Sequence, residues 1–269
     1  MALMEIPGAQ LHYRLAGEGD PLLMIRGYGS HLGWWDPVFL RELQQRFTLV
    51  LYDHRGTGRS RHEGGDYTIP GLADDAAALL KGLNIKKACV FGLSLGGMVA
   101  QELALRHPHL IKVLVLGATN CGGEKAVQPS PEVVKLLLSR AEGGGEMGEG
   151  WVHAVFTPEF VRKNPVAVKA YQERAAVLPT PPDILGLQVQ AVSSFYTWDR
   201  LPQVTIPTWI LHGERDVIVP PPNAFILRMR IPLASALILP GLGHDFPAQD
   251  PLYSSWIIKA ILPSESWSF

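Results

Sequence analysis

Residues 88–98 read ACVFGLSLGGM, and Ser94 stands at the centre of their glycine-rich middle, GLSLGG (92–97). The stretch begins as a short apolar run typical of a buried strand. It continues into MVAQELALRHP (98–108), whose apolar spacing predicts a helix. A serine between a strand and a helix, flanked by small residues, is the pattern of a nucleophile held in a tight turn. An ordinary glycine-rich turn gives the same pattern, so the rest of the chain must decide between them.

The composition describes a compact soluble protein. The chain has 269 residues, of which 47% are hydrophobic and 18% are charged, so it is long enough to bury one large core. Its 24 Lys and Arg residues nearly balance its 25 Asp and Glu residues, and no basic run stands out. This balance favours neither nucleic acid nor an anionic membrane surface as a partner, and we expect a small neutral molecule instead.

The chain shows no sign of a targeting or membrane-spanning segment. The N-terminal stretch MALMEIPGAQLHYR (1–14) lacks the basic start and long apolar core of a signal peptide. No apolar run approaches the eighteen or so residues that a membrane helix needs. The two cysteines, Cys89 and Cys121, do not form a disulfide framework. We therefore expect a cytoplasmic protein without membrane association, and homo-oligomer formation stays open.

Short apolar runs alternate with amphipathic stretches along most of the chain, which predicts a mostly parallel central sheet flanked by helices. The predicted strands are 10–17, 22–27, 47–53, 87–91, 111–119, 207–213 and 234–240. The predicted helices are 35–46, 68–83, 98–108, 221–230 and 247–261. The alternation stops between residues 120 and 202, where only four or five short helical segments appear. We therefore predict a core of residues 1–120 and 203–269 with a helical cap, residues 121–202, inserted into it.

A serine hydroxyl is a poor nucleophile unless a base takes its proton and a third group orients that base. Two later loops offer these groups. Asp216 follows a predicted strand in LHGERDVIVP (211–220), and His244 follows the next one in LPGLGHDFPAQDP (239–251). Because parallel strands end at the same edge of a sheet, the order Ser, Asp, His suits a catalytic triad with Ser94 as its nucleophile.

Taken together, these motifs resemble the α/β-hydrolase fold family, in particular its capped esterase and lactonase branch. The resemblance runs over nearly the whole chain and rests on DHRGTGRS (53–60), GLSLGG (92–97), GERD (213–216) and GHDF (243–246). It implies that Ser94 is the nucleophile, that His244 is the general base and acid, and that Asp216 is the orienting carboxylate.

The resemblance also implies an oxyanion hole made by the backbone N–H groups of Leu95 and of Tyr28 in RGYGS (26–30). Here the chain departs from the family, because Arg26 stands where a histidine is usual. Arginine is larger and permanently charged. We expect Arg26 to brace this loop, with direct contact to a substrate as the alternative.

Several residues have competing interpretations. Asp199 and Asp245 are the alternatives to Asp216 for the acid, but Asp245 adjoins His244, and neighbouring side chains seldom face each other. The glycines of DHRGTGRS (53–60) look suited to phosphate, yet the stretch lacks the Lys-Ser/Thr ending of a P-loop, so we expect a structural turn. No histidine has metal-binding spacing.

Five aromatic residues in the predicted cap are candidates for binding substrate: Trp151, Phe156, Phe195, Tyr196 and Trp198. A small helical cap must present apolar surface to the sheet domain, and that surface can either pack or roof a pocket. We expect two or three of the five to line the pocket.

The sequence thus predicts a serine hydrolase that cleaves small to medium carboxylic esters or lactones through an acyl-enzyme, with no cofactor or metal. Alternatives with the same triad are a C–C bond hydrolase of ring-cleavage products and a cofactor-free perhydrolase or haloperoxidase. A non-catalytic ligand receptor on a hydrolase fold is the alternative from another class.

Overall fold

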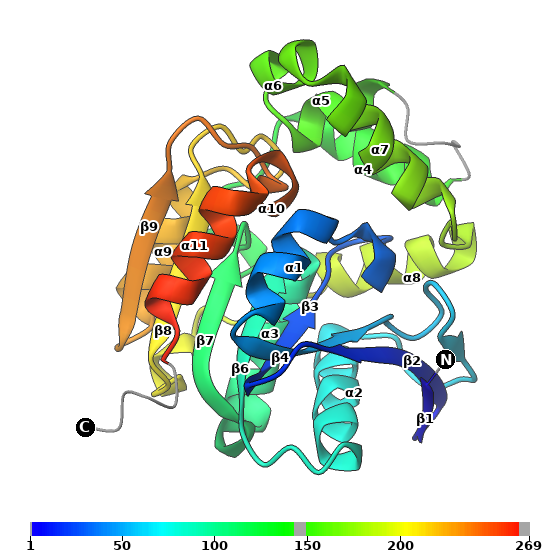
Figure 1. Cartoon of the computed structure of the whole chain (residues 1–269), viewed down its shortest axis with the longest axis vertical. Helices are drawn as coiled ribbons and strands as arrows, with labels where there is room; N and C mark the ends of the chain where they lie inside the picture. Colours follow the sequence, from blue (N-terminus) through cyan, green and yellow to red (C-terminus); the bar gives the residue numbers. More distant parts are fainter. Residues whose placement is uncertain (1, 143–148, 264–269) are drawn as a thin grey trace.

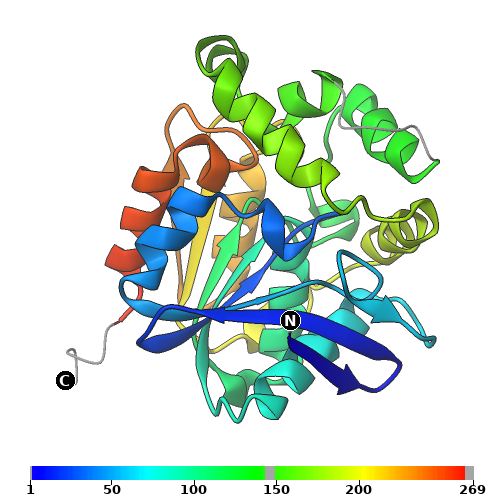
Figure 2. The same ribbon diagram turned by 45° about the vertical axis from the view of Figure 1, so that its right-hand side comes forward.

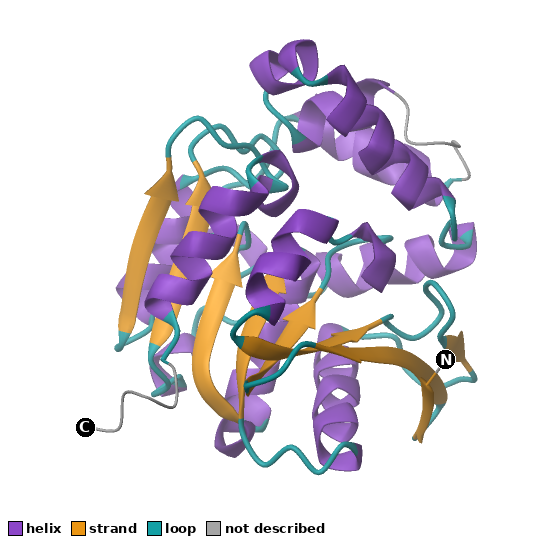
Figure 3. Cartoon of the chain, viewed as in Figure 1, coloured by secondary structure: helices purple, strands orange, loops and turns teal. Residues whose placement is uncertain are grey.

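A nine-stranded sheet runs through the computed structural model, which describes residues 2–142 and 149–263 (Figure 1, Figure 3). Its strand order is β1-β2-β4-β3-β6-β7-β8-β9, and β5 pairs with β2. Pairs that include β2 are antiparallel, and all others are parallel. The strands are β1 (Ala2–Ile6), β2 (Ala9–Ala16), β3 (Asp20–Ile25), β4 (Phe47–Tyr52), β5 (Arg61–His62), β6 (Ala88–Leu93), β7 (Ile111–Gly117), β8 (Thr208–Gly213) and β9 (Ala234–Leu239).

Helices cover both faces of the sheet, so the central strands are buried on both sides. In β6, Val90 packs into one apolar cluster, while Cys89 and Phe91 pack into the other. The first cluster includes residues of α2 (Ile69–Gly82), α3 (Leu95–Arg106) and α9 (Pro222–Arg230) on this face of the sheet, together with Ile184 and Ala191 of a helix described below. The second takes them from α1 (Pro37–Gln44), α10 (Phe246–Gln249) and α11 (Pro251–Ile261). Short 3₁₀ turns complete the core: η1 (Leu32–Trp34), η2 (Pro108–Leu110), η3 (Gly123–Lys125) and η4 (Leu201–Gln203).

Local capping explains where these helices begin. The Asp36 carboxylate accepts a hydrogen bond from Val38 N at 2.8 Å, and Pro37 occupies the first turn of α1. In α2 the Thr68 hydroxyl oxygen accepts a hydrogen bond from Gly71 N at 3.1 Å. Such caps satisfy backbone N–H groups that lack partners within the helix.

The predicted strands and helices are confirmed, with boundaries shifted by a few residues, except that the predicted helix 247–261 is divided into α10 and α11. Asp250 caps the start of α11, and Pro251 occupies its first turn. Two short strands, β1 and β5, were not part of the prediction. β1 lies at the edge of the sheet, and its alternate residues are exposed; Leu3 is 50% exposed. A half-exposed edge strand carries a weak apolar signal, which explains why this end of the sheet is longer than expected.

Five helices lie between β7 and β8 in the described part of the chain: α4 (Pro131–Ala141), α5 (Glu149–Val155), α6 (Pro158–Lys163), α7 (Pro165–Ala176) and α8 (Pro182–Ser193). Figure 2 shows α4 to α7 as a group beyond the end of the sheet to which β7 and β8 point, and α8 connects this group to the sheet domain. The helices α5 and α7 pack on the core through Ile218, Val219 and Ala248. These helices therefore cover the carboxyl ends of the parallel strands.

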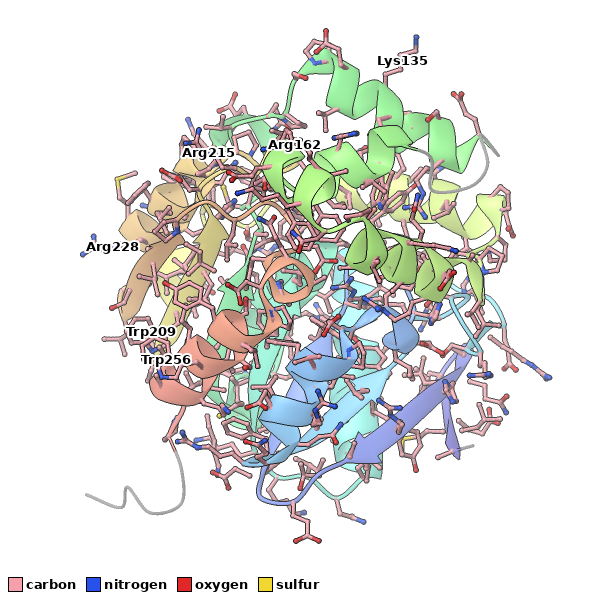
Figure 4. All side chains as sticks on the ribbon, turned by 45° about the horizontal axis from the view of Figure 1, so that its top comes forward. Lys135, Arg162, Trp209, Arg215, Arg228 and Trp256 are labelled. Atoms are coloured by element: carbon pink, nitrogen blue, oxygen red, sulfur yellow. The ribbon has the colours of Figure 1, made fainter. Side chains whose placement is uncertain are left out.

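Both parts carry charged side chains on their outer surfaces. Figure 4 shows Lys135 of α4 on the outside of the helical group, and Arg215, Arg228, Trp209 and Trp256 on the core. Trp256 is 63% exposed and stacks on Tyr253. No helix within residues 2–142 and 149–263 is long and apolar enough to cross a membrane.

Candidate active site

Ser94 occupies a strained turn between β6 and α3. Its backbone has φ 60° and ψ −122°, a conformation that a non-glycine residue rarely adopts, and its N–H donates to Gly117 O at 2.8 Å. The neighbouring glycines have no room for a side chain. A Cβ on Gly92 would lie 2.2 Å from Gly96 O, and a Cβ on Gly96 would lie 2.2 Å from Ile25 O. The glycine pattern therefore reflects close backbone approach around the serine.

Asp216 and His244 meet at the same edge of the sheet, beyond β8 and β9. His244 Nδ1 lies 2.8 Å from Asp216 Oδ2, and both side chains are buried. The other carboxylate oxygen of Asp216 accepts the N–H groups of Ile218 and Val219, each at 2.9 Å. His212 Nε2 lies 3.2 Å from Asp216 Oδ2. These contacts hold the carboxylate in place beside Nδ1 of His244. The other ring nitrogen of His244, Nε2, has no part in this contact with Asp216.

The surroundings of Asp216 keep its carboxyl ionised. Burial by itself would raise its pKa, but the charge of nearby His244 and the hydrogen bond from His212 outweigh burial and lower the pKa to about 2. Asp216 is therefore a carboxylate throughout the neutral range.

Two cavities meet at Ser94. The smaller, of about 40 Å³, is lined by Ser94 and His244 together with Trp34, Trp151 and Tyr171. The larger, of about 370 Å³, is lined by Ser94, Leu95 and Met98 and by apolar residues of α4 and α8. Tyr28 borders both. A serine exposed to a ligand-sized cavity, with a histidine in the adjoining wall, is suited to attack on a bound carbonyl.

The loop after β3 passes directly against Ser94. A Cβ on Gly27 would lie 3.1 Å from Ser94 Cβ. Gly29 N donates to Gln188 Oε1 of α8 at 2.7 Å, which anchors the loop. Within the described residues, the N–H groups of Tyr28 and Leu95 have no acceptor. Both residues line the larger cavity beside Ser94.

Arg26 is fully engaged within the protein. Its guanidinium pairs with Asp245 at 2.6 and 3.3 Å and lies 4.6 Å from the centre of the Trp35 ring. Tyr171 of α7 donates its hydroxyl to Asp245 Oδ2 at 3.1 Å. Burial opposes the charge of Arg26, but Asp245 outweighs it, and the pKa of Arg26 is raised. Arg26 thus links its loop to Asp245, which is committed to Arg26 and not to His244, and Arg26 also lines the smaller cavity.

The other competing residues lie outside the site. Asp199 is exposed. In the stretch 53–60, Asp53 accepts the N–H groups of Leu32 at 2.6 Å and Arg59 at 3.0 Å, while Arg55 pairs with Asp75. The prediction of a structural turn is therefore confirmed. No group of three or more His, Cys, Asp or Glu in the described ranges could hold a metal ion.

The expectation for the cap aromatics needs correction, because only Trp151 of the five lines either cavity in the part of the chain described here. Phe156 packs on Phe160 and Tyr171 instead. Phe195 is buried in the core, and Tyr196 forms an isolated bridge with Gly122. Trp198 stacks against Arg230 at 4.5 Å. None of these four side chains borders the two cavities at Ser94.

Sequence reasoning missed two aromatic residues of the smaller cavity, Trp34 and Tyr171. Trp34 lies in a turn before α1, and Tyr171 is the buried aromatic residue of α7. It also missed Arg140, whose guanidinium lies 4.4 Å from the Trp151 ring and 5.4 Å from the Tyr28 ring. A pattern of apolar spacing identifies the buried face of a helix but not the part of the core that this face contacts.

Comparisons with known proteins define the class. The sequence model of the family described as "Serine aminopeptidase, S33" matches residues 21–250. RutD of Azorhizobium caulinodans, provisionally named a carbamate hydrolase, is 29% identical over 248 residues, which cover 90% of this chain and 91% of RutD. A hydrolase from Pseudomonas aeruginosa PA01 is 27% identical with a TM-score of 0.83, covering 96% of this chain and 97% of that chain. A thermophilic esterase from Thermogutta terrifontis is 26% identical with a TM-score of 0.81, covering 96% and 95%.

The fold and these similarities define a hydrolase with the α/β-hydrolase fold, which confirms the predicted fold class. Because the family match spans most of its length, the chain belongs to the serine aminopeptidase S33 family of α/β-hydrolases.

Proposed function

We propose that this hydrolase cleaves small to medium carboxylic esters or lactones through an acyl-enzyme formed on Ser94. The observation that carries the proposal is the 2.8 Å hydrogen bond between His244 Nδ1 and Asp216, with His244 and Ser94 in the wall of the same cavity. The strained turn at Ser94 supports it, since such strain is typical of a nucleophile presented at a helix N-terminus.

In the proposed first step, the Ser94 oxygen attacks the carbonyl carbon while His244 Nε2 takes the hydroxyl proton. The N–H groups of Tyr28 and Leu95 stabilise the negative charge that develops on the carbonyl oxygen. The C–O bond to the leaving alcohol then breaks, and His244 donates its proton to the alcohol oxygen. Asp216 keeps the imidazole oriented and stabilises its protonated form.

Deacylation repeats these steps with water. His244 takes a proton from the water molecule as its oxygen attacks the acyl carbon. The bond to Ser94 then breaks, and the proton returns to the serine oxygen. The products are a carboxylic acid and the free enzyme.

The test is hydrolysis of methyl acetate, methyl butanoate and methyl octanoate, followed by acid release at constant pH, by the wild type and by Ser94→Ala, with the exposed Ser235→Ala as matched control. We expect Ser94→Ala to lower kcat/KM by at least about a thousandfold and the control to leave it unchanged. Equal activity of Ser94→Ala and wild type would overturn the proposal. A ligand that binds tightly without turnover would favour the alternative that the protein is a non-catalytic ligand receptor.

A carbamate is a second candidate substrate, because RutD resembles this chain over 90% of its length. The same attack by Ser94 would apply to its carbonyl carbon. Comparing ethyl carbamate with ethyl butanoate under identical conditions decides between them. A higher kcat/KM for ethyl carbamate would replace the ester proposal with the carbamate one.

A further inference from the structure

Ser94 lies at the boundary between two compartments of very different size, about 370 and about 40 Å³. Their linings differ on the two sides of the serine. His244 lines only the smaller compartment, whereas Leu95 and Met98 of α3 line only the larger one. A substrate carbonyl at Ser94 would therefore send its two substituents into unequal spaces.

The smaller compartment is bordered by buried side chains. Trp151, Val155 and Tyr171 contribute to its wall, and each is at most 6% exposed. Its volume is roughly a ninth of that of the larger compartment, about 40 against about 370 Å³, so a short alcohol fits this space better than a long one.

The larger compartment is mostly apolar. The cap helices α4 and α8 supply Val134, Leu138, Val189 and Val192, and no Asp, Glu, Lys, Arg or His of the described residues lines it. Its volume falls in the range of pockets that bind small organic molecules, about 300–1,000 Å³. The compartment suits an uncharged hydrocarbon chain or ring.

Resting on the proposed function, we infer that the substrate class is short-alcohol esters of uncharged, medium-sized apolar acids. The acyl chain occupies the larger compartment, and the leaving alcohol occupies the smaller one. The reason is mechanistic: His244 must donate a proton to the leaving oxygen, so the alcohol lies on the side of Ser94 that His244 lines. Water for deacylation enters the same small space once the alcohol has left.

The charge of the acyl group follows from the same walls. A carboxylate at the far end of the acyl chain would lose its hydration with no cation to pair it, which is costly. Arg26 and Asp245 pair with each other in the wall of the smaller compartment, and the guanidinium of Arg140 lies against the rings of Tyr28 and Trp151.

Three isomeric seven-carbon esters test the assignment, because they differ only in where the carbonyl stands: methyl hexanoate, propyl butanoate and pentyl acetate. Hydrolysis is followed by acid release at constant pH. We expect kcat/KM to fall in that order, with methyl hexanoate at least about tenfold above pentyl acetate. Monomethyl adipate, which replaces the terminal methyl of methyl hexanoate with a carboxylate, should be at least about tenfold poorer than methyl hexanoate.

Val189→Trp, which narrows the larger compartment, should lower kcat/KM for methyl hexanoate by about tenfold or more and spare methyl acetate. Its matched control is Val166→Trp at an 81% exposed position of α7, which should leave kcat/KM for both esters unchanged. Val155→Ala, which enlarges the smaller compartment, should raise kcat/KM for pentyl acetate relative to kcat/KM for methyl hexanoate. Thermal unfolding checks that each variant is folded.

The outcomes separate this inference from the proposed function. Ser94-dependent turnover with pentyl acetate equal to or better than methyl hexanoate overturns the compartment assignment and leaves the ester hydrolase intact. Efficient turnover of monomethyl adipate would show that the larger compartment accepts a charged acyl group, which overturns that part of the inference. Absence of Ser94-dependent turnover of every ester overturns the proposed function and this assignment with it.

Discussion

Tyr171 of α7 donates its hydroxyl to Asp245, the residue directly after His244, at 3.1 Å. A helix of the cap is thereby joined to the loop that carries the candidate base. The same loop receives a second link, since Asp245 N donates to Val155 O at 3.1 Å. The position of the cap and the position of His244 are therefore mechanically connected.

Removing this hydroxyl should weaken the connection. Tyr171→Phe loses one hydrogen bond to a buried carboxylate, so we expect the free energy of unfolding to fall by about 1.5–3 kcal/mol. Urea denaturation measures it. Tyr253→Phe is the control, because the Tyr253 hydroxyl has no hydrogen bond to any described residue. An equal loss in both variants would show that the Asp245 contact adds nothing.

The Arg26–Asp245 pair should behave as a coupled unit. Arg26→Met or Asp245→Leu alone leaves one buried charge without its partner, which should cost about 3–5 kcal/mol of unfolding free energy. The double variant removes both charges and should lose clearly less than the sum of the two single losses. Chemical denaturation of all four proteins completes the cycle. Additive losses would argue against the pairing.

Gly96 should tolerate no side chain. The Cβ of Gly96→Ala would lie 2.2 Å from Ile25 O, which would push the turn of Ser94 away from β3. We expect loss of at least about 2 kcal/mol of unfolding free energy together with loss of ester hydrolysis. Gly186→Ala in α8, where nothing lies within 4 Å of the added Cβ, should be neutral or slightly stabilising. A fully active Gly96→Ala enzyme would contradict the close packing at the turn.

Asp216 should contribute to acid stability. Its pKa of about 2 is below the value of about 3.9 expected in the unfolded chain, so the native state binds the proton more weakly. The contribution is complete above pH 4 and is lost as the pH falls toward 2. Unfolding midpoints in urea from pH 6 to 2.5 should therefore fall more steeply for wild type than for Asp216→Asn. The exposed Asp66→Asn should follow the wild type, and parallel profiles for all three would refute the prediction.

Much of this arrangement could be predicted from sequence. Apolar runs alternating with amphipathic stretches indicate a parallel sheet, and parallel strands end at one edge, so residues after β8 and β9 must lie near the end of β6. That argument requires no side-chain detail, and Asp216 and His244 lie in contact as expected. The loop after β3 is expected beside Ser94 from the resemblance, and its contact with Ser94 follows from the pairing of β3 with β6.

Contacts that depend on tertiary packing could not be predicted. Arg26 and Asp245 are 219 residues apart, and nothing in their local sequence indicates a partner. Tyr171 has the same helical signal as any buried aromatic residue, so its contact with Asp245 was not foreseen. The cap aromatics were overestimated because burial against the core and exposure to a cavity produce the same apolar pattern.

The most direct test of the central claim is covalent labelling of Ser94. A fluorophosphonate ester is incubated with the protein at neutral pH, and intact-mass and peptide mass spectrometry locate the adduct. We expect one stoichiometric adduct on Ser94, loss of ester hydrolysis in proportion to labelling, and no adduct with Ser94→Ala. Labelling at another residue, or hydrolysis that persists after Ser94 is fully modified, would contradict it.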